Sequence, residues 1–163
     1  MSNKLIYIIG GVVVLLLVWW LFTGGMASLA GAPAGVDADR NVDGSTTYTS
    51  DEGSVTVGTQ SMPSNWPSDA PDNYAGASIT FSGTSNPQTG QIGSALSYTV
   101  RATASAVADY YKQQLQAKGW TIQATANAGG AMVVSATKDT RTFGAYIADT
   151  GGGMTTVTAG IEL

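Results

Sequence analysis

The sequence predicts an α+β protein, in which an N-terminal transmembrane helix is followed by an antiparallel sheet with one helix packed on it. Three observations lead to this prediction. An uncharged apolar run opens the chain at Leu5–Phe22, one stretch of helical periodicity lies at residues 106–118, and alternating polar and apolar runs flank that stretch. The element order expected after residue 64 is β-β-α-β-β-β-β.

The amino-acid composition excludes several classes of function. The 163 residues include 7 Lys+Arg and 11 Asp+Glu, which gives a net charge of -4, and they include no Cys and no His. Without cysteine there is no disulfide, no thiol nucleophile and no lipidated cysteine, and without histidine there is no Ser-His-Asp triad. Because nucleic acids are bound through clustered Lys and Arg, we expect no nucleic-acid partner.

The apolar run at residues 5–22 is long enough to cross a membrane. Its 18 residues would form a helix of about 27 Å, close to the roughly 30 Å of bilayer hydrocarbon. Tyr7 and the pair Trp19 and Trp20 would lie near opposite interfaces, where aromatic residues are enriched. We predict an uncleaved signal anchor that contacts the lipid bilayer. A cleaved signal peptide, which would leave a secreted domain, remains the alternative.

The orientation of the anchor follows from its flanking charges. Lys4 is the only charged side chain before Asp37, so the positive-inside rule places residues 1–4 in the cytoplasm. We therefore expect a single-pass membrane protein whose C-terminal domain lies outside the cytoplasm.

Residues 23–63 are rich in Gly, Ala, Ser, Thr and Asp and show no helical period. This composition is typical of a flexible linker between the anchor and a folded domain. A short alternation at Ser54–Val57 is a candidate strand within it.

One motif in the linker is a candidate metal site. Asp39, Asn41 and Asp43, followed by Gly44, match the opening of a calcium-binding loop. Oxygen ligands at alternate positions suit the shell of 6–8 oxygens around Ca²⁺. The twelfth position is Ser50 rather than Glu, and an ordinary Asp/Asn/Gly turn is the alternative interpretation. No other cofactor is expected.

Residues 64–163 are expected to form the extracytoplasmic α+β domain. Six runs read as strands: residues 78–82, 95–103, 120–126, 131–137, 142–148 and 154–163. Short breaks containing Gly, Asn or Asp separate the last four, as in β-hairpins. The natural packing for this order is an antiparallel sheet with the helix across its apolar face.

The single helix of this domain is expected at Ala106–Lys118, with Thr103 or Ser105 as N-cap. Its buried stripe consists of three residues at helical spacing: Val107, Tyr111 and Leu115. Gly119 fits the left-handed position that ends many helices.

Two segments carry a family resemblance. WPSDAPDNYAGASITFSG (Trp66–Gly83) and SAVADYYKQQLQAKGWTI (Ser105–Ile122) resemble a recurrent, uncharacterised domain of bacterial envelope proteins and lipoproteins. In that family a WPsDxP turn precedes a strand, and a helix of this pattern precedes a β-meander. The resemblance covers about residues 66–163 and implies an envelope location. Its motifs are structural, so it implies no catalytic residues.

The function we expect is a non-catalytic binding or accessory module of the cell envelope, with envelope proteins or polymers as partners. The carboxylates of the domain lie mostly at expected turns and termini, and no spacing pairs them for acid–base catalysis. The candidate binding surface is the Ser/Thr-rich sheet face opposite the helix, with Arg101, Gln123 and Tyr146. A structural subunit of an envelope assembly or pilin-like filament is the alternative, since low charge and an apolar N-terminal helix are compatible with it.

Overall fold

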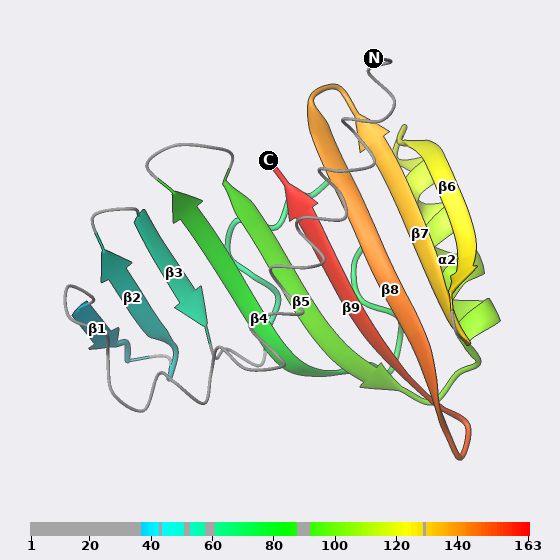
Figure 1. Ribbon diagram of the computed structural model, residues 1–163, viewed down its shortest axis with the longest axis horizontal. Coiled ribbons are helices and arrows are strands. Elements are labelled where there is room, and N and C mark those ends of the chain that lie inside the picture. The colour runs from blue at the N-terminus through cyan, green and yellow to red at the C-terminus, as the bar shows by residue number, and fades with distance from the viewer. Residues whose placement is uncertain (1–36, 43, 51–52, 58–60, 88–91, 129) are drawn as a thin grey trace.

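The computed structural model describes residues 37–163 apart from residues 43, 51–52, 58–60, 88–91 and 129 (Figure 1). The expected anchor at residues 5–22 lies outside the described residues. Among the helices of the described residues, none is long and apolar enough to cross a membrane.

The described chain forms one antiparallel sheet of nine strands and a helix. The elements are β1 (Asp37–Arg40), β2 (Thr46–Ser50), β3 (Gly53–Val57), β4 (Ser78–Pro87), β5 (Gly93–Val100), α2 (Ala104–Ala117), β6 (Thr121–Ala128), β7 (Ala131–Lys138), β8 (Arg141–Gly151) and β9 (Met154–Glu162). The strand order is β1-β2-β3-β4-β5-β9-β8-β7-β6, so the C-terminal strand pairs with β5 in the middle of the sheet (Figure 1).

The predicted fold class is confirmed as a β-rich α+β domain with an antiparallel sheet and one helix. Each of the six predicted strands corresponds to one of β4 to β9, although their ends differ. The largest difference is at β4, which continues to Pro87 instead of ending at Ser82. Its continuation pairs with β3 on one side and β5 on the other, and such pairing is not visible in the local pattern.

The structure also differs from the expected linker. Three strands, β1 to β3, lie within residues 23–63, where only Ser54–Val57 was a candidate strand. They extend the sheet one after another from β4, with Val57 opposite Gly83. Strand pairing can stabilise a segment that contains few apolar residues. Composition does not reveal such pairing, so residues 23–63 resembled a spacer.

The ends of α2 are set by local hydrogen bonds. The Thr103 side chain accepts a hydrogen bond from the Ala106 N–H at 3.2 Å, which makes Thr103 the N-cap. At the other end Gly119 has φ +81°, and the Trp120 N–H donates to the Leu115 carbonyl at 2.8 Å. This is a Schellman motif, and it confirms the left-handed glycine expected there.

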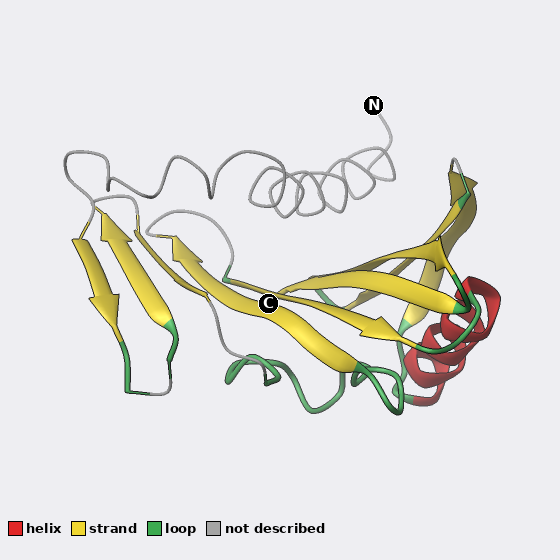
Figure 2. Ribbon diagram, turned by 90° about the horizontal axis from the view of Figure 1, so that it is seen from below, coloured by secondary structure: helices red, strands yellow, loops and turns green. Residues whose placement is uncertain are grey.

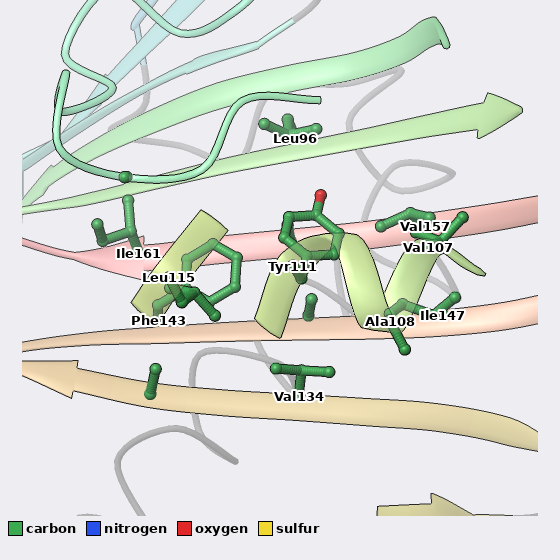
Figure 3. Close-up of a cluster of buried hydrophobic side chains, with 14 of the residues drawn as sticks. Leu96, Val107, Ala108, Tyr111, Leu115, Val134, Phe143, Ile147, Val157 and Ile161 are labelled. Atoms are coloured by element: carbon green, nitrogen blue, oxygen red, sulfur yellow. The ribbon is translucent and has the colours of Figure 1, made fainter. Parts of the chain in front are cut away.

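The core lies between α2 and the sheet (Figure 3). The helix buries Val107, Ala108, Tyr111 and Leu115 against β7, β6 and β8. Phe143 of β8 is at the centre of an aromatic group, with its ring centroid 5.5 Å from that of Tyr111. Residues of this core are almost completely buried, so the space between the helix and the sheet is filled by side chains.

Residues 62–77, here called the docking segment, lie on the same side of the sheet as α2 (Figure 2). Five of its residues pack against the core: Met62, Trp66, Ala70, Tyr74 and Ala77. The Trp66 indole N–H donates to the Pro71 carbonyl at 2.9 Å, which closes the segment into a compact turn. The helix and the docking segment together cover one face of the sheet over β5 to β9 (Figure 2), the strands that supply most of the core residues.

Candidate functional site

The opposite face of the sheet, over β5, β9, β8 and β7, is here called the open face. Its residues follow from strand alternation and register: Ala95, Ser97, Thr99, Thr156, Thr158, Gly160, Glu162, Thr142, Gly144, Tyr146, Ala148, Val133, Ser135 and Thr137. Within the described ranges no helix or loop lies over this face (Figure 2). The Ser/Thr-rich face expected from the sequence is therefore present in the fold.

Tyr146 is the large aromatic side chain of the open face, and it is 42% exposed. In the cross-strand register it lies beside Thr158 on β9 and Val133 on β7. The neighbouring row of the sheet consists of small residues: Ala95, Gly160, Gly144 and Ser135. Because these residues have small side chains or none, this row adds little bulk to the open face beside Tyr146.

Several polar side chains of the open face already make hydrogen bonds within the domain. The Ser97 hydroxyl donates to the Val157 carbonyl at 2.9 Å, and the Thr142 hydroxyl donates to the Glu162 carboxylate at 2.9 Å. At the edge of the sheet the Gln123 amide donates to the Thr137 hydroxyl at 2.8 Å. These bonds fix the positions of several polar groups of the open face, so the face is partly pre-organised.

The predicted surface residues do not all meet. Tyr146 and Gln123 lie on the same side of the sheet, as expected. Arg101 lies beyond the end of β5, in the turn that leads to α2, and it is exposed there. The alternation that suggested Arg101 stops at Val100, because Thr103 already caps the helix.

Four carboxylates of the domain lie on four different segments: the docking segment, α2, the β7–β8 turn and β8. Asp109 pairs with Lys112 at 2.5 Å, Asp149 accepts from the Gly151 N–H at 2.7 Å, and Asp139 occupies the β7–β8 turn with φ 54°. Asp72 lies 4.0 Å from Lys118. Across the residues that the structure describes, no three Asp, Glu, His or Cys side chains group as metal ligands would.

Asp69 is the most connected carboxylate, and sequence reasoning missed its role. Arg141 donates to both carboxylate oxygens, at 2.8 and 2.7 Å, and Lys138 donates to one at 2.7 Å. These hydrogen bonds, that of Arg141 first, lower the pKa of Asp69 well below its usual value. The only signal in the sequence was the position of Asp69 in the WPSD motif.

The ion pairs of Asp69 attach the docking segment to the β7–β8 hairpin. Two further bonds act on the same stretch, since Lys118 donates to the Ala70 carbonyl at 2.6 Å and the Trp120 indole donates to the Asp69 carbonyl at 2.6 Å. Arg141 also lies over the Trp120 ring, 5.2 Å from its centroid. The geometry of the cluster is therefore that of a structural link between segments. Both carboxylate oxygens of Asp69 already accept hydrogen bonds within it.

A tyrosine pair is buried under the docking segment. The hydroxyls of Tyr98 and Tyr111 lie 3.0 Å apart, and the Tyr74 N–H donates to the Tyr98 hydroxyl at 3.4 Å. Burial raises the pKa of Tyr98 to about 12 and also raises that of Tyr111. Both hydroxyls are neutral at physiological pH, and they hydrogen-bond in the core instead of serving as bases.

The calcium-loop candidate is only partly described. Asp39 lies in β1, Asn41 lies in the turn to β2, and Asp43 is outside the described residues. The Asn41 amide nitrogen donates to the Ser45 hydroxyl at 2.8 Å and to the Thr47 hydroxyl at 3.0 Å. The turn thus connects two strands, and calcium binding by Asp39, Asn41 and Asp43 stays a prediction.

Comparison with known proteins gives one finding. A protein-family model described as START domain-like matches residues 79–153, the stretch from β4 to the turn after β8. The match covers less than half of the chain, and it supports no specific family of envelope proteins or lipoproteins. No curated protein and no solved structure matches the chain.

Proposed function

We propose that this protein is a membrane-anchored, non-catalytic binding or accessory module of the cell envelope, with the open face as its binding surface. Residues 5–22 would hold it in the bilayer, and residues 64–163 would present the open face outside the cytoplasm. The partner would be an envelope protein or polymer with hydroxyl or amide groups that match the Ser and Thr side chains around Tyr146.

The observation that carries this proposal is the difference between the two faces. On the covered face the aromatic core is packed, with Tyr111 and Phe143 almost completely buried. On the open face Tyr146 is 42% exposed and stands beside a row of small residues. An exposed aromatic within fixed polar groups is a common composition for a recognition surface. The match of residues 79–153 to a START domain-like model also supports a ligand-binding role.

Site-specific photocrosslinking in a bacterial host tests the binding surface. A benzophenone amino acid is placed at position 146 of the full-length chain, and a matched control carries it at Gln113, an exposed position on α2. We expect a discrete crosslinked product at position 146 and none at position 113, with the partner identified by mass spectrometry. The absence of a product at 146, or equal products at both positions, would contradict the proposal.

The location is tested separately on the same cells. Alkaline carbonate extraction should leave the full-length chain in the membrane fraction, and its intact mass should include Met1 or Ser2. Protease added outside the cytoplasmic membrane should digest the C-terminal domain. A soluble product whose mass begins near Gly31 would replace the anchored module with a secreted domain.

A further inference from the structure

Strand β6 forms one edge of the sheet, and its outer side is unpaired by any strand in the described part of the chain. Its sequence, Thr121–Ala128, contains no charged residue and no proline. The five residues 123–127 are all exposed. An uncharged, exposed edge strand presents free N–H and C=O groups to which another strand can bond.

The opposite edge of the same sheet is protected. Strand β1 is four residues long, and three of them are charged: Asp37, Asp39 and Arg40. Short length and charged side chains are two of the means by which proteins prevent edge strands from pairing. Strand β6 has twice the length and neither device, so the two edges are not equivalent.

The register of the β6–β7 hairpin indicates which backbone groups face outward. Ala128 and Ala131 are opposite each other in the register, and two residues separate them along the chain. The turn therefore closes with a backbone bond between them, and the next bonded pair along the ladder is Ala126 with Val133. The N–H and C=O groups of Thr125 and Asn127 then point away from β7.

The straight part of β6 is long enough for a further pairing. A bulge interrupts the β6–β7 register between Ile122 and Ala124, which leaves residues 124–128 in regular register. Ala124 and Ala126 extend on the open side of the sheet, and no bulky or charged side chain flanks them in this run. Nothing in the run therefore blocks the approach of another strand.

We propose that β6 pairs with β6 of a second copy of this chain, antiparallel and centred on Ala126. In this register Thr125 of one copy is opposite Asn127 of the other, so their outward N–H and C=O groups form four backbone hydrogen bonds. The segment is self-complementary because it is neutral and because its outward groups are spaced symmetrically about Ala126. Two-fold symmetry is the commonest symmetry of homo-oligomers.

The pairing has a consequence for the open face. The two-fold axis is perpendicular to the sheet, so both open faces, each with its Tyr146, lie on the same side of a continuous sheet. A partner with repeated binding groups would then contact two copies at once, which raises its apparent affinity. This consequence depends on the proposed binding function, whereas the pairing itself does not.

Disulfide trapping tests the pairing directly, because the chain has no native cysteine. In the proposed register the two Ala126 residues form a non-hydrogen-bonded pair, with their Cα atoms about 4.5 Å apart, within the range that a disulfide spans. The full-length Ala126→Cys variant is purified in excess mild detergent and oxidised with copper phenanthroline. We expect it to form covalent dimer at least tenfold faster than Ala38→Cys, the control on β1.

Two second-site changes make the test specific. Thr125→Pro removes an outward N–H without removing a bond to β7, and Thr125→Lys adds a charge at the edge. Each is combined with Ala126→Cys, and circular dichroism verifies that the domain remains folded. We expect both to reduce dimer formation at least tenfold. Equal crosslinking of Ala38→Cys and Ala126→Cys, no crosslinking of Ala126→Cys, or folded double variants that crosslink unchanged would each overturn the pairing.

Discussion

The substitution Asp69→Asn should destabilise the folded domain by about 2 kcal/mol. It keeps the shape of the side chain but removes the charge that Lys138 and Arg141 share. The Asn side chain accepts through a single oxygen, and its NH₂ group then faces the two cations. The docking segment is consequently held less firmly against the β7–β8 hairpin.

The magnitude follows from the geometry of the cluster. Asp69 accepts three charge-assisted hydrogen bonds of 2.7 to 2.8 Å, and bonds to charged groups contribute about 1.5–3 kcal/mol when water is excluded. The Asp69 side chain is 34% exposed, so solvent screening reduces these values toward the roughly 0–1 kcal/mol of surface pairs. A total of about 2 kcal/mol would lower Tm by roughly 10 °C in a domain of this size.

The assay is urea unfolding of the full-length chain in mild detergent, followed by tryptophan fluorescence, since Trp66 and Trp120 lie at the cluster. The control is Asp109→Asn, which removes an exposed i,i+3 pair with Lys112 and should cost less than about 0.5 kcal/mol. Equal losses for Asp69→Asn and Asp109→Asn would refute the reasoning.

The pH dependence provides a second check. The pKa of Asp69 is lower in the folded chain than its unfolded value of about 3.9. Its contribution is therefore fully present above that value and is lost as pH falls below it toward the folded pKa. The difference in unfolding free energy between the wild type and Asp69→Asn should be constant from about pH 5 to 7 and should shrink below about pH 4. A difference that stays constant down to pH 2 would contradict the assignment.

Three further predictions concern the helix and the core. Gly119→Ala should lower the free energy of unfolding in urea by about 1–2 kcal/mol, because φ of Gly119 is +81°. The added Cβ would meet only the Lys138 side chain, at 3.8 Å, so the cost comes from the backbone. An unchanged unfolding midpoint would argue against the Schellman motif. Leu115→Ala should cost about 2–5 kcal/mol, since Leu115 is completely buried in the core, and a loss below 1 kcal/mol would show that the core tolerates the cavity. In an ultraviolet pH titration, Tyr98 should ionise near pH 12. The stability that its neutral hydroxyl contributes is therefore fully present below about pH 10 and should be lost as pH rises toward 12. Ionisation of every tyrosine near pH 10 in the folded chain would disprove the burial of Tyr98.

Features that depend on neighbours along the chain could be read from the sequence. The helix was predicted from the spacing of Val107, Tyr111 and Leu115. Gly119 correctly marked its end, and of the two candidate N-caps, Thr103 and Ser105, the structure has Thr103. Strands β4 to β9 were predicted, with different ends, because a strand with one face in the core repeats every two residues. The Ser/Thr-rich face with Tyr146 followed from the same alternation.

The tertiary structure decided everything that depends on distant segments. Strand β9 pairs with β5 in the middle of the sheet, and β1 to β3 exist because each pairs with a neighbour. Asp69 meets Arg141 across 72 positions of the chain, and no local period records such an approach. The unpaired edge at β6 likewise results from strand order. A sequence specifies local conformation through its period and caps, whereas partners far apart in the chain are chosen by the packing of the whole domain.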